Sequence, residues 1–385
     1  MTMTSITKAE QTNIGKKTDL LSLTLPQLQA WLVERREASF RAKQIYHWLY
    51  RGLVTDFAQM TSLSLALRER LAGEASIGPV IVRSELHSKD DRTRKILLEL
   101  ADGKLIESVL MLYPPLGEGS ARATVCVSSQ AGCAFGCTFC ATGQMGFARH
   151  LSAGEIVAQV LYFARELRAA PWAAVGLPGS APIDHITNIV LMGMGEPLHN
   201  YENVMQALRI LNSADGFNLG ARHMTVSTVG LVPAIRRLSQ EPLQINLAIS
   251  LHAPTDELRG KTMPVNRKYP IAELLAAVQD YIKESGRQVT FEYVLLAGVN
   301  DTPEYAHKLG ELLAPLKQFA HVNCIPVNAT SASYKAPQPE AIRAFRDILF
   351  EHGVSNSVRA ERGDDIAAAC GQLRTQFERQ RNKRQ

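Results

Sequence analysis

Six cysteines are the residues of this chain whose number and spacing point most directly to chemistry. They are Cys126, Cys133, Cys137, Cys140, Cys324 and Cys370, and four of them fall within 15 residues. The first 24 residues are polar and lack the apolar core of a secretory signal, so a disulfide scaffold is not expected. The grouped thiols therefore predict a metal or redox site.

The tightest group has the spacing Cys-x3-Cys-x2-Cys, from Cys133 to Cys140. Three thiolates on one loop can hold three irons of a cubane cluster, which leaves the fourth iron open to another ligand. Phe139 is expected to shield this cluster from solvent. The alternative is a zinc site with Cys126 as the fourth ligand. Zinc ligands more often form two Cys-x2-Cys pairs separated by a longer loop, so the spacing favours iron and sulfur.

A second group of residues follows a predicted strand, 186–192, and reads Gly193-Met-Gly195-Glu196-Pro197. Glycines let the backbone approach a ligand closely, and the carboxylate can accept hydrogen bonds from an ammonium group. The ends of later predicted strands also carry polar residues, at Ser227, at Ser250-Leu251-His252 and at Asn328. Each of them alone would be a turn or cap residue. Together, the coincident strand ends predict one shared ligand site.

Strand and helix patterns alternate from about residue 124 onward. The predicted strands are 124–128, 186–192, 223–228, 245–251, 290–295 and 322–327. The predicted helices are 152–167, 201–211, 232–238, 271–284, 303–316 and 340–352. Six such units predict an α/β fold with a parallel sheet, open or curled as a partial (βα)6 barrel. Its ligand site is expected at the carboxyl ends of the strands.

The rest of the chain divides by composition and periodicity. Helical spacing extends from about Leu25 to Arg70, and two strand-like runs, 95–100 and 104–111, flank Asp102-Gly103 as a hairpin. The predicted divisions are a disordered leader (1–24), a helical domain (25–75), a β-hairpin linker (76–118), a barrel (119–355) and a C-terminal segment with Cys370 and a basic tail (356–385). Residues 169–183 are expected to form a loop.

Overall composition is ordinary for a globular protein, with 46% hydrophobic and 21% charged residues among 385. No run of about 18 apolar residues predicts a membrane span. The net charge of +5 permits a nucleic-acid partner without requiring one. Five basic residues lie between Arg35 and Arg51, and five more lie in the tail from Arg374. Each group is either a solvated face or a surface for phosphates.

These segments together resemble the RlmN-type RNA adenine-C2 methyltransferases of the radical S-adenosylmethionine (SAM) superfamily, which shares the Cys-x3-Cys-x2-Cys motif. The matching segments are Cys126–Gln130, the three-cysteine motif, Gly193–Pro197 and Arg362–Cys370. Phe40–Trp48 is similar to the family's N-terminal RNA-recognition domain. The resemblance covers roughly residues 25–373. The leader, the insertion near Pro114–Ser120 and the basic tail lie outside it.

The resemblance implies a role for each matching residue. Cys133, Cys137 and Cys140 would ligate one [4Fe–4S] cluster, and SAM would bind Gly195, Glu196, Ser227, Ser250, Leu251, His252 and Asn328. Cys370 would carry the methyl group as S-methylcysteine, Cys126 would resolve the covalent adduct, and Glu107 would accept a proton. The alternative for Glu107 is an exposed hairpin carboxylate. Cys324, within an apolar strand, is interpreted as a small buried hydrophobe.

Chemistry explains why such groups would be needed. C2 of adenine is electron-poor and does not attack the sulfonium methyl of SAM, whereas a methyl-derived radical can add to it. By resemblance, one SAM methylates the Cys370 thiolate, and a second is cleaved to a 5′-deoxyadenosyl radical that takes a hydrogen from that methyl group. The methylene radical adds to C2, Glu107 removes the C2 proton, and Cys126 attacks the Cys370 sulfur to form a transient disulfide.

The implied substrates are an adenine of the peptidyl-transferase centre of 23S rRNA and the adenine 3′ to the anticodon of tRNAs. Phosphates would bind around Arg36–Arg51, and Tyr46 and Trp48 would stack on bases or fill the core, with helical spacing favouring the core for Trp48. A flavodoxin- or ferredoxin-like electron donor, a cytoplasmic location and a monomer are expected. Open alternatives are a C8-specific (Cfr-type) rRNA methyltransferase and a zinc-stabilised RNA-binding protein without catalysis. A sulfur-inserting radical enzyme would need a second cluster motif, which the remaining cysteines do not supply.

Overall fold

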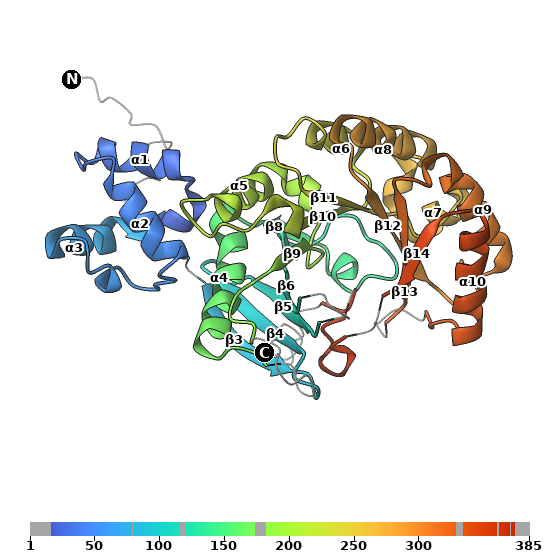
Figure 1. Cartoon of the computed structure of the whole chain (residues 1–385), viewed down its shortest axis with the longest axis horizontal. Coiled ribbons are helices and arrows are strands. Elements are labelled where there is room, and N and C mark those ends of the chain that lie inside the picture. The colour runs from blue at the N-terminus through green and yellow to red at the C-terminus, as the bar shows by residue number, and fades with distance from the viewer. Residues whose placement is uncertain are drawn as a thin grey trace, which may run out of the picture.

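A ten-stranded sheet forms the centre of the molecule (Figure 1). The computed structural model describes residues 17–78, 80–115, 120–173, 182–328, 334–359, 362–369 and 371–373. The strand order is β14-β13-β12-β11-β10-β9-β6-β5-β4-β3. The bounds are β3 (Val80–His87), β4 (Thr93–Leu100), β5 (Leu105–Tyr113), β6 (Arg122–Cys126), β9 (Asn188–Leu191), β10 (Met224–Thr228), β11 (Asn246–Ser250), β12 (Val289–Leu295), β13 (Ala320–Pro326) and β14 (Ser355–Val358).

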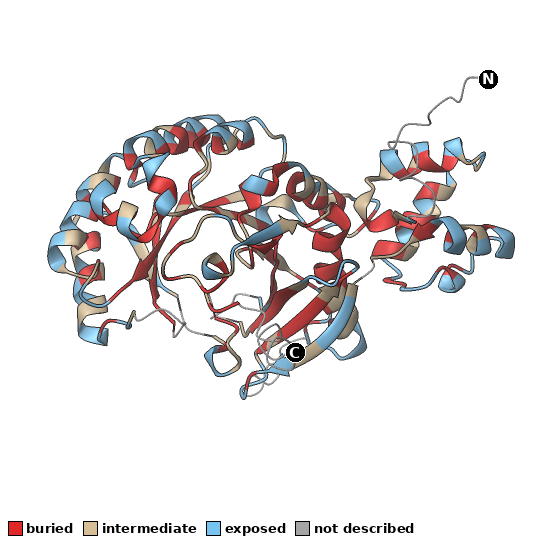
Figure 2. Ribbon diagram, turned by 180° about the vertical axis from the view of Figure 1, so that it is seen from behind, coloured by how far each residue is buried: buried red, intermediate tan, exposed pale blue. Residues whose placement is uncertain are grey.

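From β6 to β14 all neighbouring strands run parallel, and helices connect them. These helices are α4 (Ala153–Ala169), α5 (Tyr201–Asn212), α6 (Val232–Leu238), α7 (Asp256–Thr262), α8 (Ile271–Ser285), α9 (Pro303–Leu313) and α10 (Pro339–Glu351). Buried residues run along the strands and the inner faces of the helices, and exposed residues cover the outer faces (Figure 2). The predicted parallel sheet, curled as a partial barrel, is confirmed.

Helix α7 and strand β14 are two of the elements that the sequence patterns do not predict. Helix α7 has seven residues and a mostly polar sequence, so its apolar spacing carries no helical signal. The side chain of Thr255 starts it by accepting a hydrogen bond from the Leu258 backbone. Strand β14 has only four residues, Ser-Asn-Ser-Val, and gains its structure from pairing with β13.

The other end of the sheet is antiparallel and contains the predicted hairpin. β4 and β5 pair with Lys95 opposite Val109, and β5 pairs with β6 so that Val109 also lies opposite Cys126. The hairpin therefore continues the barrel sheet without a break. β3, which was not predicted, adds an edge strand beside β4.

A network of ion pairs anchors this hairpin to helix α4. Ser152 caps the helix by accepting a hydrogen bond from Glu155 N, and the Glu155 carboxylate accepts one from Ser152 N. Arg149 donates to both Glu155 oxygens at 2.8 Å and to Asp102, in the hairpin turn, at 2.6 and 3.1 Å. The Arg149 guanidinium lowers the pKa of Asp102 to about 2.

Short strands and three helices form the N-terminal lobe, at the left of Figure 1. The lobe contains β1 (Thr18–Asp19), α1 (Leu25–Glu34), α2 (Arg41–Tyr50), α3 (Leu65–Glu74) and β2 (Ala75–Ser76). The boundary predicted at residue 24 is too late. Leu20 and Leu21 are buried, and β1 pairs with β2, so the ordered lobe already includes these residues. Of the predicted leader, residues 1–16 lie outside the described residues.

Candidate active site

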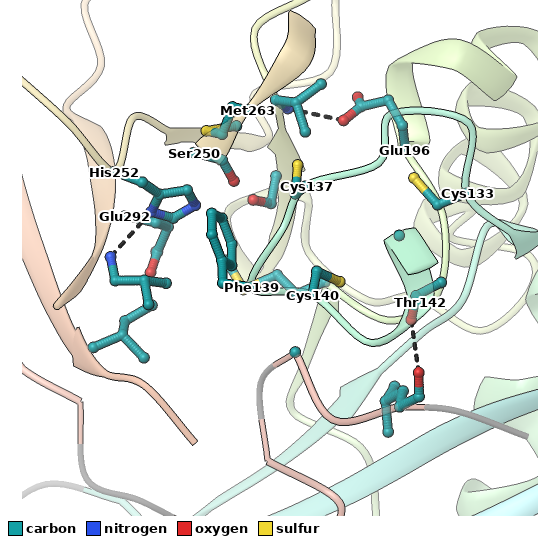
Figure 3. A pocket seen from close by; sticks show the side chains of 18 of the residues that line it. Cys133, Cys137, Phe139, Cys140, Thr142, Glu196, Ser250, His252, Met263 and Glu292 are labelled. Carbon is teal, nitrogen blue, oxygen red and sulfur yellow. Dashed lines mark hydrogen bonds between the residues drawn. The ribbon is translucent and has the colours of Figure 1, made fainter. Parts of the chain in front are cut away.

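A cavity of about 1050 Å³, counted to its open mouth, lies at the carboxyl ends of the parallel strands (Figure 3). Its walls include the three grouped cysteines and six of the seven residues expected to bind SAM. These lining residues are Cys133, Cys137, Cys140, Gly195, Glu196, Ser227, Ser250, His252 and Asn328. Leu251 is the exception: its side chain is fully buried, and it contributes backbone bonds to the wall. The structure therefore brings these strand-end residues together around one cavity, as predicted.

The cysteine loop lies between β7 (Gln130–Gly132) and β8 (Phe147–His150). A backbone bond from Cys133 N to Gly146 O at 2.9 Å closes the base of the loop, and one from Thr138 N to Thr262 O at 3.0 Å anchors its middle. Burial raises the pKa of the Cys133 thiol to about 12, and burial together with the two neighbouring thiols raises the pKa of Cys137 well above its usual range. Such thiols ionise only when a cation compensates the charge, which suits ligands of a metal cluster.

The donor set fits a cluster better than a single zinc ion, which takes four protein ligands in a structural site. A tetrahedral zinc would draw its sulfurs together around bonds of about 2.3 Å, whereas a cubane takes each thiolate at a different iron. Cys126, the fourth ligand of the zinc alternative, lines a different cavity. The residues present therefore fit an iron–sulfur cluster held by three cysteines.

The Gly195-Glu196 turn forms the wall beside the cysteines. Gly195 has a φ of +101°, and a Cβ there would approach Cβ of Gln130 within 2.5 Å, so only glycine fits. The Glu196 carboxylate accepts hydrogen bonds from Leu198 N at 3.0 Å and Val229 N at 2.8 Å. Burial nevertheless raises the pKa of Glu196 to about 7. A bound ammonium group would favour the ionised form of this carboxylate.

His252 closes the opposite wall, across Phe139 from the cysteines in Figure 3. Its Nδ1 accepts a 3.0 Å hydrogen bond from Val294 N, so the proton of the neutral ring lies on Nε2. Burial and the nearby Arg259 guanidinium lower the pKa of His252 to about 3. The Phe139 ring packs edge-on against the imidazole with centroids 4.9 Å apart. The expected shielding role of Phe139 agrees with its burial in this wall.

Sequence patterns gave no sign of Arg259, a fully buried guanidinium behind this wall. It donates to the carbonyls of Val229, Ser250 and Leu251 and to the side chain of Asn266, at 2.7 to 3.1 Å. These bonds join the segments that follow β10 and β11. Arg259 thereby fixes two walls of the cavity relative to each other. Its position in the unpredicted helix α7 explains why the spacing of apolar residues could not reveal it.

Glu292 and Arg359 are two further lining residues that were not expected. Glu292 lies within β12 and accepts a 2.9 Å hydrogen bond from Asn323 Nδ2. Burial raises the pKa of Glu292, and the Arg359 charge opposes that shift. Glu292 is an interior residue of its strand, Arg359 directly follows β14, and neither belongs to a recognisable motif. A polar residue inside an apolar strand was the available signal for Glu292.

A second cavity of about 560 Å³ adjoins the first and shares Asn328 and Arg359 with it. Cys126 lines this second cavity, together with Ala369 and Leu373 of the C-terminal segment. Gly371 lines the first cavity. Cys370 itself lies outside the described residues, as does the basic tail. Cys324 is fully buried in β13, as expected for a core residue, and no disulfide joins the cysteines that the structure describes.

Glu107 is a buried residue of β5, and the alternative of an exposed hairpin carboxylate is wrong. Its carbonyl accepts a 2.6 Å hydrogen bond from Ser128 Oγ, and that hydroxyl also accepts one from Met194 N. Its carboxylate lies 3.3 Å from Lys95 Nζ. Val109 pairs with Cys126, and Glu107 is two residues from Val109, so Glu107 and Cys126 occupy the same face of the sheet.

Comparison with known proteins shows which family this chain resembles. The model of the ribosomal RNA large subunit methyltransferase N-terminal domain matches residues 18–77, and the radical SAM superfamily model matches residues 181–309. A probable dual-specificity RNA methyltransferase RlmN of Roseiflexus castenholzii is 46% identical over 394 residues, covering 94% of this chain and 97% of that protein. A Chloroflexus aurantiacus protein of the same name is 49% identical, covering 94% and 91%.

The chain belongs to the RlmN family of radical SAM RNA methyltransferases. A crystal structure of a radical SAM methyltransferase from Sphaerobacter thermophilus also matches, with a TM-score of 0.86 and 49% identity over 93% of this chain and 99% of that one. The resemblance found in the sequence is confirmed. An RNA-binding protein without catalysis is therefore excluded as a description of this RlmN-family chain.

Membership in RlmN and in the radical SAM superfamily implies a [4Fe–4S] cluster and SAM as cofactors. The donor set agrees, since three thiols and a buried carboxylate line one cavity at the strand ends. No helix among the described residues is both long and apolar enough to cross a membrane. The match from residue 18 also agrees with an N-terminal lobe that begins before the predicted boundary at 25.

Proposed function

We propose that this RlmN-family enzyme methylates C2 of adenine in 23S rRNA and in tRNA through a methyl group carried on Cys370. The observation that carries the proposal is the pair of adjoining cavities, one lined by the three grouped cysteines and the other by Cys126. The C-terminal segment contributes to both cavities. Gly371 lines the first, Ala369 lines the second, and Leu373 lines both. A methyl carrier on this segment would serve the cofactor cavity and the substrate cavity in turn.

Cys133, Cys137 and Cys140 would hold one [4Fe–4S] cluster per chain. When bound and reduced, the cluster supplies the electron that cleaves SAM to methionine and a 5′-deoxyadenosyl radical. The Glu196 carboxylate would receive the SAM amino group, and the polar strand ends at Ser227, Ser250 and Asn328 would bind the rest. His252 would offer its Nε2–H as a donor, since Nδ1 is already used. Two SAM molecules would be consumed per turnover.

Cys126 would resolve the covalent intermediate between Cys370 and the RNA. Its thiolate attacks the Cys370 sulfur, an S–S bond forms, and the bond from sulfur to the methylene carbon breaks with its electron pair leaving on carbon, which takes a proton to become the methyl group. The unpaired electron that radical addition leaves on the adduct, together with one electron from the redox partner, would reduce the disulfide to two thiols for the next turnover. Cys126 is buried, so the reaction would be protected from competing thiols. Glu107, on the same face of the sheet, would take the C2 proton of the adduct.

The N-terminal lobe would bind RNA phosphates. Fewer of its basic side chains are available for this than the sequence suggested, because some of them pair with acidic residues of the fold. Arg35 pairs with Glu74 at 2.9 Å and packs over Trp31, while Lys43 lies 3.6 Å from Asp215 of the barrel. Arg36 and His47 are exposed and Arg41 is partly exposed, so these three basic residues are the ones we propose for RNA contact. Tyr46 is fully buried, so it is a core residue and not a stacking platform. Trp48 is half-buried, with its ring N–H donating to Ser62.

The exposed aromatic residue of this lobe is Phe40, which is 57% exposed. The Arg41 guanidinium lies 4.8 Å from its ring centroid. An exposed ring beside a basic side chain is suited to stack on an unpaired base and to contact its phosphate. A small flavodoxin- or ferredoxin-like protein would supply electrons, and the enzyme would act as a monomer.

Mass spectrometry of nucleosides tests the proposed function. The anaerobically reconstituted enzyme, given SAM, reductant and unmodified 23S rRNA or tRNA, should yield 2-methyladenosine. The rival C8 specificity would yield 8-methyladenosine from rRNA instead. Product in neither position, from an enzyme with its full iron content, would refute the proposal.

A further inference from the structure

Lys95 is a buried lysine that no cofactor or substrate role has used so far. It lies in β4, its side chain is only 9% exposed, and that of Glu107 is 6% exposed. The Lys95 Nζ is 3.3 Å from Glu107 Oε1 and donates a 2.9 Å hydrogen bond to the Ala367 carbonyl. One ammonium group therefore connects the carboxylate to the C-terminal segment, three residues before Cys370.

The sheet register brings these groups to one face. Lys95 and Cys126 both lie opposite Val109, from the two strands that flank β5. Side chains opposite one another in an antiparallel sheet project to the same side. Lys95, Glu107 and Cys126 therefore share the face on which Cys126 meets the second cavity.

The C-terminal segment packs on this same face. The Asp365 carboxylate accepts a 2.9 Å hydrogen bond from Lys89 N, in the β3–β4 turn. Gly363 lies so close to β4 that a Cβ on it would approach Cγ2 of Thr93 within 2.7 Å. The bond from Lys95 to Ala367 belongs to this contact, so the lysine joins the strand bearing Glu107 to the segment that leads to Cys370.

Stability alone gives little reason to bury this pair. The cost of removing two charges from water often exceeds their mutual attraction, and apolar side chains of similar volume can replace a buried ion pair without loss of stability. β4 is otherwise rich in buried aliphatic residues, such as Ile96 and Leu98. A charged lysine is useful here if the buried carboxylate has to remain ionised and fixed in direction.

We propose that Lys95 is a positioning residue for Glu107, holding the carboxylate ionised and aimed at C2 of the adenine bound to Cys370. This inference rests on the proposed function of Glu107 as the base. In the step concerned, the C2–H bond breaks, its electron pair stays on the adenine ring, and the proton passes to the carboxylate. The proton transfer needs no oxidant or further reactant. The bond from Lys95 to Ala367 sets the distance between the base and the segment that carries the adduct.

Four variants test the proposal in the full-length, cluster-loaded enzyme: Lys95→Met, Lys95→Gln, Lys95→Arg and Glu107→Gln. Lys95→Gln is the second neutral variant, because its amide can still donate to the Ala367 carbonyl. Lys104→Met, in the exposed hairpin turn, is the matched control. Three quantities are measured: S-methylation of Cys370 by peptide mass spectrometry, 5′-deoxyadenosine released with RNA, and covalent protein–RNA adduct on denaturing gels.

Both neutral variants should methylate Cys370 and release 5′-deoxyadenosine within about twofold of the wild type, yet accumulate at least tenfold more adduct. Lys95→Arg should restore adduct resolution, because it keeps the charge. Adding Lys95→Met to Glu107→Gln should have no further effect, since the lysine acts through the carboxylate. Lys104→Met should behave as the wild type.

Three results would overturn the inference. If Lys95→Met and Lys95→Gln lose Cys370 methylation as fully as product, the lysine is structural. If they resolve adduct at the wild-type rate while Glu107→Gln does not, Lys95 has no role and the proposed base remains. If Glu107→Gln itself resolves adduct normally, the base assignment fails and the role of Lys95 fails with it.

Discussion

The Thr142 hydroxyl donates a 2.7 Å hydrogen bond to the carbonyl of Leu373, which ties the end of the cysteine loop to the C-terminal segment (Figure 3). A second bond, from Ala141 N to Gly371 O at 2.8 Å, runs beside it. The loop proposed to hold the cluster therefore directly supports the residues on the C-terminal side of Cys370. The two halves of the proposed chemistry are coupled through these bonds.

Replacing Thr142 by Val should weaken this coupling without changing the shape of the side chain. A buried carbonyl then loses its donor, at a cost of about 1 to 2 kcal/mol, and Cys370 methylation should slow by roughly 5- to 30-fold. Single-turnover mass spectrometry of the Cys370 peptide measures this methylation rate. Thr138→Val is the control, because Thr138 lies on the same loop but its hydroxyl bonds Tyr334 and not the C-terminal segment. Equal methylation rates in Thr142→Val and the wild type would contradict the coupling.

Replacing Cys126 by Ala should stop resolution of the covalent intermediate. The adduct between protein and RNA should then approach one per chain, with product reduced at least 100-fold, because no other thiol reaches the Cys370 sulfur in this account. Denaturing electrophoresis with labelled RNA detects the adduct. Cys324→Ala is the matched control, since Cys324 is another buried cysteine outside the cysteine loop. Normal turnover by Cys126→Ala would show that Cys126 has no resolving role.

Acid should destabilise the fold partly through His252. Its pKa is about 3 in the folded chain, against an ordinary value near 6.5, so the unfolded chain binds more protons between these values. Stability contributed by the neutral ring is present above pH 6.5 and is lost as pH falls towards 3, by up to about 5 kcal/mol at 1.4 kcal/mol per unit.

Urea unfolding of the cofactor-free protein from pH 7 to pH 4 measures this loss. His252→Asn should flatten the profile, because Asn accepts the Val294 bond, tolerates the φ of +57° and does not titrate in this range. The exposed residue His185 provides the control variant His185→Asn, which should keep the wild-type profile. A His252→Asn profile as steep as that of the wild type would refute the argument.

RNA binding should depend on salt through the N-terminal lobe. Each phosphate contact contributes a slope of about 0.7 to 0.9 to the fall of log K with log salt. Arg36→Gln should therefore reduce that slope by roughly one contact and weaken rRNA and tRNA binding alike. Lys283→Gln, on exposed helix α8 of the barrel, is the control. An unchanged slope for Arg36→Gln would remove this residue from the RNA surface.

Sequence reasoning succeeded where local patterns carry the information. Apolar alternation and helical spacing identified six of the seven parallel strands and six of the seven helices that the structure describes in the barrel, and the strand ends then located Glu196, Ser227 and Ser250 together. It failed where tertiary contacts decide. β14 exists through pairing with β13, and the boundary at residue 24 missed Leu20 and Leu21, whose burial depends on the folded lobe.

Buried charges were the least accessible part of the site. Arg259 became part of the site through its bonds to carbonyls of distant segments, and no short motif records such bonds. Lys95 and Glu107 meet because two strands pair in one register. A single residue of slippage would separate them. The basic stretch from Arg35 to Arg51 was overcounted for the same reason, since Arg35 and Lys43 are paired within the fold.

The yield of 5′-deoxyadenosine from the anaerobically reconstituted enzyme, given SAM, a reductant and RNA, decides whether this chain cleaves SAM to a radical. We expect about four irons per chain, 5′-deoxyadenosine in step with methylated adenine, and loss of both when Cys137 is replaced by Ala. An enzyme that methylates RNA with no iron, or with no 5′-deoxyadenosine, would contradict radical cleavage of SAM by this chain.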